Sequence, residues 1–279
     1  MSSSLAMTFP YKKALIIGAT SGIGLELANR LVGEGVFVIA TGRRQDRLDS
    51  FLATVGSAKA SAAHLDLAKI DQIPSFAKRI IDAHPDLDAL FLNAGVQYVM
   101  DFSKAWTVDI SKIQHEITVN YISIVALTHA FLPFFQAKPA NTESALIYTT
   151  TSLMSVPYPM VLNYCASKAA LHSFILSVRE QLKFAKTPEG KIRLIEIVTP
   201  LVQTELHDGQ PGWDPGFNPG MPVADFVEDT LQGLAAQDET IAVGHAKQVF
   251  DEFEANKGTR VGPAWEMARK NLGKAHQFD

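Results

Sequence analysis

The chain has 279 residues, 47% hydrophobic and 19% charged, which is the balance of a globular protein with a sizeable core and excludes a disordered or fibrous chain. Its 25 basic and 29 acidic residues leave a net charge of −4, which disfavours nucleic acid or an anionic membrane as the main partner. A single cysteine excludes an internal disulfide, and the first residues lack a signal-peptide pattern. Because the longest apolar stretch, near 122–135, is too short to cross a bilayer, we expect a cytoplasmic protein without a membrane span.

Short apolar runs alternate with stretches that carry apolar residues at helical spacing. Strands are predicted near 12–17, 36–40, 61–65, 89–92, from 146 onward, 192–198 and 240–243. Helices are predicted near 22–33, 45–55, 70–83, 113–135, 164–184 and 223–235. This alternation is typical of βαβ units, so we predict an α/β fold with a doubly wound parallel sheet of about seven strands and helices on both faces. Residues 1–279 are predicted to form a single domain.

Two regions rich in glycine and proline interrupt the pattern. Residues 207–222 contain four glycines and four prolines, which fits either a plain surface loop or a substrate lid, predicted at 205–222, over the carboxyl edge of the sheet. A second break at 257–264 precedes a predicted terminal amphipathic helix, within a C-terminal helical extension at 246–279.

The first predicted strand runs into the turn Gly18-Ala-Thr-Ser-Gly22-Ile-Gly24, and a helix follows. Glycine permits positive φ and a close backbone approach, and the free N–H groups of a helix start can hold a diphosphate. The turn fits a tight strand–helix connection, but the flanking elements favour a dinucleotide site. The cofactor contacts expected here are Gly18, Thr20, Ser21, Gly22, Ile23 and Gly24.

The segment Tyr164-Cys-Ala-Ser-Lys168 places a phenol and an amine one turn apart on one helix face. A tyrosine has a pKa of about 10, which makes it a poor acid or base at neutral pH. A nearby lysine ammonium favours the phenolate and is expected to lower that pKa. The pair is therefore a candidate for general acid–base catalysis.

In spacing and order, the glycine turn, an Asn93-Ala94-Gly95 segment and the Tyr-x-x-x-Lys pair resemble the short-chain dehydrogenase/reductase family, over about residues 12–243. The resemblance implies a Rossmann fold and hydride transfer between a nicotinamide and a carbonyl or alcohol group. Reduction of C=N or C=C bonds, or a non-catalytic NADP-binding regulator, are the alternatives. The chain departs from the family pattern at Ile17, where a threonine is favoured, and at Pro200, which replaces a glycine in the family's P-G-x-V-x-T segment.

The second predicted strand ends in Thr41-Gly42-Arg43-Arg44, without the carboxylate that holds the ribose hydroxyls in NAD sites. Arginine can pair with a 2′-phosphate, so we predict NADP(H), with Arg43 a stronger candidate than Arg44. The further cofactor contacts that the resemblance implies are Thr41, Asp66, Leu67, Asn93, Ala94, Gly95, Tyr164, Lys168, Val202 and Thr204.

The resemblance also implies catalytic roles. Tyr164 would exchange the proton, Lys168 would tune it, and Asn120 would hold a water in a proton relay. The family's catalytic serine lies 13 residues before the tyrosine, and this position holds Thr151, whereas the residue type favours its neighbour Ser152. The spacing favours Thr151 slightly.

The expected substrate is a small, fairly apolar molecule, because Met160, Trp213, Phe217 and Met221 could form an apolar pocket rim or pack a lid. No metal site is expected, since the histidines lack metal-ligand spacing. By the resemblance, a homodimer or homotetramer would form through the helices that carry Asn120 and Tyr164.

Overall fold

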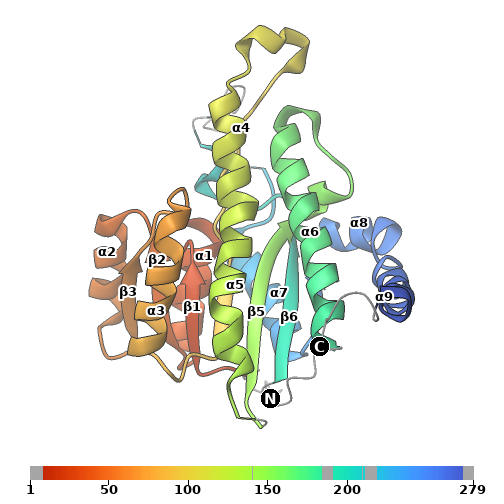
Figure 1. The fold of residues 1–279 in the computed structure, drawn as a ribbon. Coiled ribbons are helices and arrows are strands. Elements are labelled where there is room, and N and C mark those ends of the chain that lie inside the picture. The colour runs from red at the N-terminus through yellow and green to blue at the C-terminus, as the bar shows by residue number, and fades with distance from the viewer. Residues whose placement is uncertain (1–8, 140, 184–190, 209, 211–218, 273–279) are drawn as a thin grey trace, which may run out of the picture.

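The computed structural model describes residues 9–139, 141–183, 191–208, 210 and 219–272 (Figure 1). Within them, parallel strands form one sheet in the order β3-β2-β1-β4-β5-β6-β7. The strands are β1 (Lys13–Ile17), β2 (Phe37–Gly42), β3 (Ala60–His64), β4 (Ala89–Leu92), β5 (Glu143–Thr151), β6 (Lys191–Thr199) and β7 (Thr240–Ala242). The order reverses between β1 and β4, as in a doubly wound sheet.

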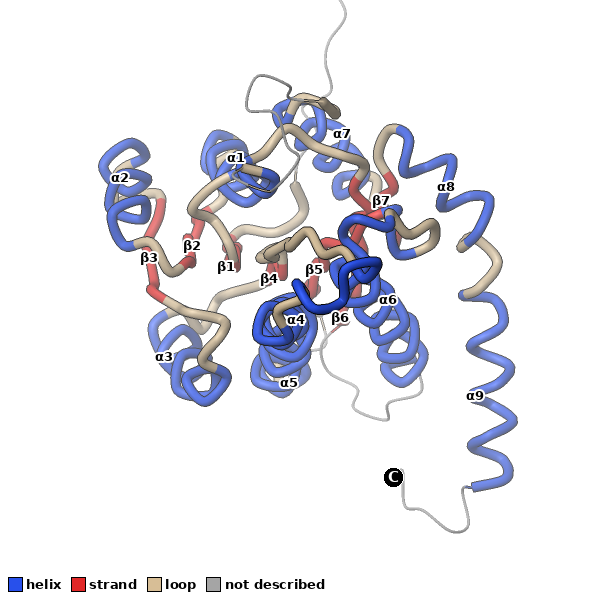
Figure 2. The backbone as a smooth tube through the Cα atoms, turned by 90° about the horizontal axis from the view of Figure 1, so that it is seen from above, coloured by secondary structure: helices blue, strands red, loops and turns tan. Residues whose placement is uncertain are grey.

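Helices cover both faces of the sheet (Figure 2). The first face carries α1 (Gly22–Gly33), α2 (Gln45–Val55) and α7 (Val223–Ala235). The second face carries α3 (Ile73–Ala83), α4 (Ile110–Ile117), α5 (Ser123–Gln136) and α6 (Leu162–Lys183). The predicted fold class is confirmed.

The central strands β1, β2 and β4 are buried on both sides, which explains their nearly continuous apolar sequences. In β1, Ala14 and Ile16 pack into the core under α1 and α7, whereas Leu15 and Ile17 pack into the core under α3 and α5. Successive side chains of a strand point to opposite faces, so a single strand contributes to both cores.

The predicted helix at 113–135 begins earlier and contains an irregular turn. It runs from α4 through a π-helical turn, η3 (Thr118–Ile122), into α5. By length and composition Ile110–Gln136 could cross a membrane. However, Leu127, Phe131 and Phe135 are fully buried against the sheet, so this is a core helix of the fold.

The described part of the predicted C-terminal extension is helical, but its break lies at 254–257 and not at 257–264. The helices there are α8 (His245–Phe253) and α9 (Gly258–Leu272), and α9 runs through the predicted break at 257–264, with Pro263 inside it. Gly262 lies against the carboxylate of Glu180 on α6, where an added Cβ would be 3.1 Å from Oε2. Contact with α6 therefore outweighs the weak helix propensity of glycine and proline.

Much of the predicted lid at 205–222 lies outside the described residues, and so do Trp213 and Phe217. The described C-terminal end of this segment is hydrogen-bonded to the residues just before the segment. Met221 donates its N–H to the Leu201 carbonyl at 2.9 Å, and Gln203 donates to the Met221 carbonyl at 3.0 Å. A short helical turn, η6 (Glu205–His207), lies between them.

Candidate active site

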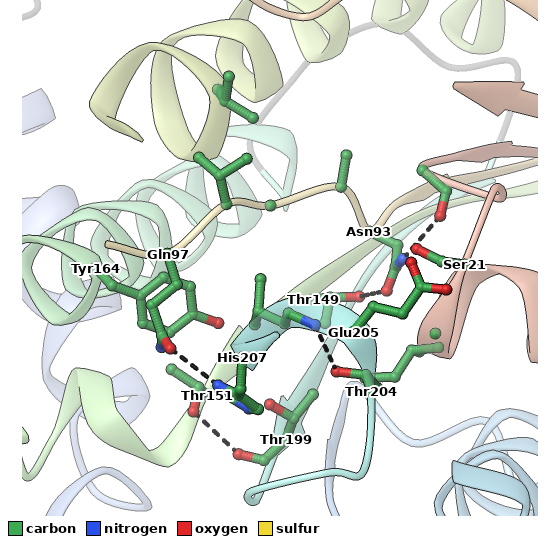
Figure 3. Close-up of a pocket in the computed structure, with 18 of the residues that line it drawn as sticks. Ser21, Asn93, Gln97, Thr149, Thr151, Tyr164, Thr199, Thr204, Glu205 and His207 are labelled. Carbon is green, nitrogen blue, oxygen red and sulfur yellow. Dashed lines mark hydrogen bonds between the residues drawn. The ribbon is translucent and has the colours of Figure 1, made fainter. Parts of the chain in front are cut away.

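A cavity of about 1150 Å³ opens at the carboxyl edge of the sheet, lined by the segments that follow β1, β2, β3, β4, β5 and β6. This edge, next to the reversal of strand order, is where doubly wound folds bind ligands. Of the predicted site residues, all except Gly24 and Asn120 line this cavity. In Figure 3, Tyr164 and Thr151 lie toward one end of the view, and Ser21 and Asn93 toward the other.

The glycine turn has the geometry of a phosphate-binding loop. Gly18 and Gly22 adopt φ values of 89° and 53°, which favour glycine. A Cβ on Gly24 would lie 2.0 Å from the Gly18 carbonyl oxygen, so the start of α1 packs directly on the turn. The first turn of α1 contains no acidic residue, and Ser21 makes no side-chain cap. The residues present therefore fit the diphosphate of a dinucleotide.

Arginines gather beside this turn, after β2. Arg44 donates to the Thr20 hydroxyl at 2.9 Å from Nη2 and to the Ser21 hydroxyl at 2.7 Å. Arg44 and Arg47 both pair with Glu205 of η6, at 3.2 and 2.6 Å. Hydrogen bonding from Arg47, more than from Arg44, holds the pKa of the Glu205 carboxyl below its usual range. Arg43 lines the cavity and is exposed.

Arg47 and Glu205 were not among the site residues predicted from the sequence. Arg47 lies in the first turn of α2, three residues after Arg44, so a third basic residue close to the predicted phosphate site was a usable signal. Glu205 lies 158 residues further along the chain, so no local pattern connects it to the arginines.

The loops after β3 and β4 line the cavity between the turn and the tyrosine. Asp66 and Leu67 follow β3, and Asp66 accepts the Ala68 N–H at 3.1 Å. Asn93, after β4, accepts a hydrogen bond at Oδ1 from the Thr149 hydroxyl at 3.2 Å. A Cβ on Gly18 would lie 2.8 Å from Cα of Ala94, so these loops approach the glycine turn closely.

Helix α6 carries the phenol and the amine into the cavity. Tyr164 is 7% exposed and Lys168 is 3% exposed. Nζ of Lys168 donates to the Thr149 carbonyl at 2.8 Å and lies 5.7 Å from the centroid of the Tyr164 ring. Burial lowers the pKa of Lys168 to about 8, against the opposing charge of Glu196.

The expected direction of the tyrosine pKa is wrong in this structure. Burial, with smaller contributions from Cys165 and Glu116, raises the pKa of the Tyr164 phenol. The Lys168 ammonium does not reverse this, because it is directed to the Thr149 carbonyl. Tyr164 is thus a protonated donor at neutral pH.

The end of β5 supplies the candidate hydroxyl groups. Thr149 and Thr151 line the cavity, and Thr150 between them is fully buried, as the alternation of a strand requires. Thr151 donates to the Thr199 carbonyl at 3.2 Å (Figure 3). Ser152 also lines the cavity, at the start of the turn η4 (Ser152–Met154). Both candidates remain next to the space where a substrate would bind.

Asn120 lies in η3, behind the cavity wall, and is fully buried. Its Oδ1 accepts the Val96 N–H at 2.8 Å, and its Nδ2 donates to the Val96 carbonyl at 2.9 Å and to the Ser167 hydroxyl at 3.1 Å. The side chain therefore joins the loop after β4 to the helix that carries Tyr164. The proton relay through a water on the backbone carbonyl of Asn120 stays a prediction.

At one side of the cavity, hydrogen bonds connect the loop after β4 to the segment after β6. Nδ1 of His207 and Oε1 of Gln97 are 3.0 Å apart (Figure 3). Gln210 donates to the Gln97 carbonyl at 3.0 Å. Burial lowers the pKa of His207, which keeps the ring neutral at physiological pH. No motif had marked Gln97 or His207.

The predicted apolar rim holds only in part. Met160 lines the cavity, together with Val99, Leu153, Tyr158, Val161 and Leu206. Met221 is not among the lining residues, because it packs against the core under α1 and α7.

Comparisons with known proteins agree with this fold and site. The profile of the short chain dehydrogenase family matches residues 12–214. An uncharacterized oxidoreductase, DltE, of Bacillus subtilis is 33% identical over 242 residues, which cover 87% of this chain and 92% of that protein. A serine 3-dehydrogenase of Rhizobium radiobacter is 30% identical over 240 residues, or 82% and 90% of the two chains.

Solved structures show the same fold. An alcohol dehydrogenase of Thermococcus sibiricus, complexed with 5-hydroxy-NADP, has a TM-score of 0.67 at 23% identity and covers 80% of this chain and 90% of its own. A dehydrogenase of Burkholderia phymatum in complex with NAD has a TM-score of 0.70 at 19% identity, with coverage of 84% and 89%. The fold and the site, with these relatives, thus define an oxidoreductase. The chain belongs to the short-chain dehydrogenase/reductase family.

Proposed function

We propose that the protein is an NADP(H)-dependent oxidoreductase that interconverts a carbonyl group and an alcohol on a small, fairly apolar substrate. The observation that carries the proposal is the buried pair of Tyr164 and Lys168, which lines one cavity with the glycine turn. A proton donor and a dinucleotide cradle in one cavity are what carbonyl reduction by hydride transfer needs.

In this proposal, a bound nicotinamide supplies the hydride. The backbone of the glycine turn and the start of α1 hold the diphosphate, and Val202 and Thr204 orient the nicotinamide end. Tyr164 donates its hydroxyl proton to the substrate oxygen as negative charge develops there. The hydroxyl of Ser152, or that of Thr151 after it turns away from the Thr199 carbonyl, hydrogen-bonds the same oxygen. Such donors accelerate the reaction because they are fixed before the charge appears.

Lys168 supports the proton transfer electrostatically. Its ammonium group lies near the Tyr164 ring and stabilises the phenolate that proton donation leaves behind. The buried surroundings strengthen this attraction, since opposite charges interact more strongly away from water.

The preference for NADP(H) over NAD(H) is supported by the end of β2. Arg43 and Arg44 line the cavity there, and neither Thr41 nor Gly42 offers a carboxylate that would repel a 2′-phosphate. Arginine pairs with phosphate through two parallel hydrogen bonds. Members of the family bind either cofactor, so this preference rests on the arginines.

The test is NADPH oxidation with a panel of small ketones and aldehydes. We expect turnover with some of them and a loss of roughly 10²- to 10⁴-fold in kcat for Tyr164→Phe, the size of a general-acid contribution. Tyr121→Phe, at a tyrosine outside the cavity, is the matched control and should retain activity. Parental turnover by Tyr164→Phe would contradict the assignment, and cofactor binding without turnover on any compound would favour a regulator.

Cytoplasmic location and assembly into a homodimer or homotetramer are further proposals. The exposed side chains of Ile110 on α4 and Ile122 on η3 support an association surface along these helices. Size-exclusion chromatography with light scattering would test the assembly, and a monomer at micromolar concentration would contradict it.

A further inference from the structure

A buried cluster of charged side chains lies behind the active site. Nδ1 of His172 is 2.9 Å from Oε1 of Glu196, and Nε2 of His172 is 3.1 Å from Oε2 of Glu254. The three side chains are 7%, 0% and 1% exposed. They come from α6, from the middle of β6 and from the residue directly after α8, so the cluster joins three parts of the chain that are distant in sequence.

The geometry indicates that His172 is an imidazolium. An ionised carboxylate only accepts hydrogen bonds, so a ring nitrogen facing each carboxylate must carry a proton. The two carboxylates raise the pKa of His172, with Glu196 the stronger, although burial acts to lower it. Lys257 adds a further cation at 2.7 Å from Glu254, and the Phe250 ring packs edge-on against His172.

The cluster touches the active site through β5. Thr150 donates its hydroxyl to Oε1 of Glu196 at 2.7 Å. Its neighbours carry two active-site groups: the carbonyl of Thr149 accepts from Lys168, and the hydroxyl of Thr151 lines the cavity. Glu196 therefore anchors the strand between these two groups.

The cluster also touches the active site through α6. His172 follows Lys168 by four residues, so both lie on the same helix face. The charge of Glu196 favours the ammonium form of Lys168 against the effect of burial. Arg179, further along α6, also interacts with the charge of Glu196.

A buried ion cluster is poorly explained by stability alone. Buried ion pairs often stabilise a fold no better than apolar side chains of the same volume, because the charges lose their hydration. This cluster is better explained by two roles: it positions β5 at the active site, and its charge acts on Lys168.

We propose that Glu196 and His172 are positioning residues of the active site: Glu196 holds the Thr149–Thr151 segment and is the buried counter-charge of Lys168, while His172, held by Glu254, partly neutralises Glu196. The catalytic meaning of this arrangement rests on the proposed function. The coupling of charge between Glu196, His172 and Lys168 does not.

The test is an NMR titration of the Lys168 side chain in the full chain with isotope-labelled lysine, the signal being assigned by its absence in Lys168→Arg. Glu196→Gln keeps an acceptor for Thr150 but removes the charge, so the pKa of Lys168 should fall by about one unit. His172→Asn keeps a donor at the place of Nδ1 but removes the cation, so the pKa of Lys168 should rise. Damage to packing alone would not produce opposite shifts.

Glu180→Gln is the matched control, because Glu180 is also a largely buried acid on α6 but pairs with Lys183. It should leave the Lys168 titration unchanged. Equal or same-direction shifts in Glu196→Gln and His172→Asn would overturn the proposal. If either variant fails to fold, nitrogen NMR of His172 in the parent protein decides: we expect both ring nitrogens protonated at about pH 7, and a neutral ring there would overturn it.

These readouts need no turnover, so they separate this inference from the proposed function. If carbonyl reduction is found, the alkaline limit of kcat should move with the Lys168 pKa in each variant, while the KM for NADPH stays within about twofold, since no cofactor contact changes. If the two variants show opposite NMR shifts but no carbonyl compound is reduced, the proposed function fails and the charge coupling stands.

Discussion

The ammonium group of Lys168 is almost completely buried, and this limits the pH range over which the active site can work. Burial lowers its pKa from 10.5 to about 8, so the ammonium form is present below this pH and lost above it. Tyr164 stays protonated through the same range, because burial raises its pKa. We expect kcat for carbonyl reduction to be level below about pH 8 and to fall about tenfold per pH unit above it. A steady-state pH profile at saturating NADPH measures this, and a level profile to about pH 10 would contradict it.

Arg43 is the residue on which cofactor choice depends in this account. A charge-assisted hydrogen bond contributes about 1.5–3 kcal/mol, so Arg43→Ala should weaken NADPH binding roughly 10- to 100-fold. NADH binding should hardly change, because NADH lacks the 2′-phosphate. Fluorescence titration of both cofactors measures the effect, with Arg79→Ala on the surface of α3 as control. Equal losses for both cofactors would assign Arg43 to another part of the nucleotide.

At the scale of residues, pairs that are close in the sequence were predicted correctly, whereas contacts between distant residues were not. Tyr164 and Lys168 share a helix face in the sequence and in the structure. The direction of the Tyr164 pKa was wrong, because burial depends on the packing of the whole molecule. No local pattern connected His172 to its partners Glu196 and Glu254, because they lie 24 and 82 residues away.

At the scale of elements, the packing of α1 on the glycine turn can be tested with two glycines of that helix, one in contact with the turn and one away from it. Gly24→Ala would place a Cβ 2.0 Å from the Gly18 carbonyl oxygen, and such overpacking costs about 1–3 kcal/mol of unfolding free energy. Gly33→Ala, at the other end of α1, meets nothing within 4 Å and should be neutral or stabilise by up to about 1 kcal/mol. Urea unfolding of both variants provides the comparison. Equal midpoints would mean that the turn and the helix are not in contact.

Element types were predictable because each strand and helix shows its period locally, but two features were not. The π-helical turn at Thr118–Ile122 has no periodicity of its own, and Asn120 within it was expected in a regular helix. In α9, Gly258, Gly262 and Pro263 read as a break, whereas contact with α6 keeps the chain helical. Tertiary contacts decided both cases.

For the whole molecule, a ligand that binds only the folded state raises its stability by mass action. NADPH at about 100 times its Kd should add about 2.7 kcal/mol and raise Tm, and NADH at the same concentration should add less. Thermal unfolding with each cofactor measures this. Arg43→Ala should remove most of the difference between them, and equal Tm shifts in the parent protein would contradict the NADP(H) preference.

The central claim is that this fold brings a hydride and a proton to the two ends of one carbonyl bond. The most direct measurement is mass spectrometry and NMR of the product formed with NADPH deuterated at C4 of the nicotinamide. We predict one deuterium on the carbinol carbon, with the hydroxyl proton coming from Tyr164 and hence from solvent. Deuterium on the carbon β to an intact carbonyl, as hydride addition to a conjugated C=C bond would give, or no transfer to any carbonyl compound, would contradict the account.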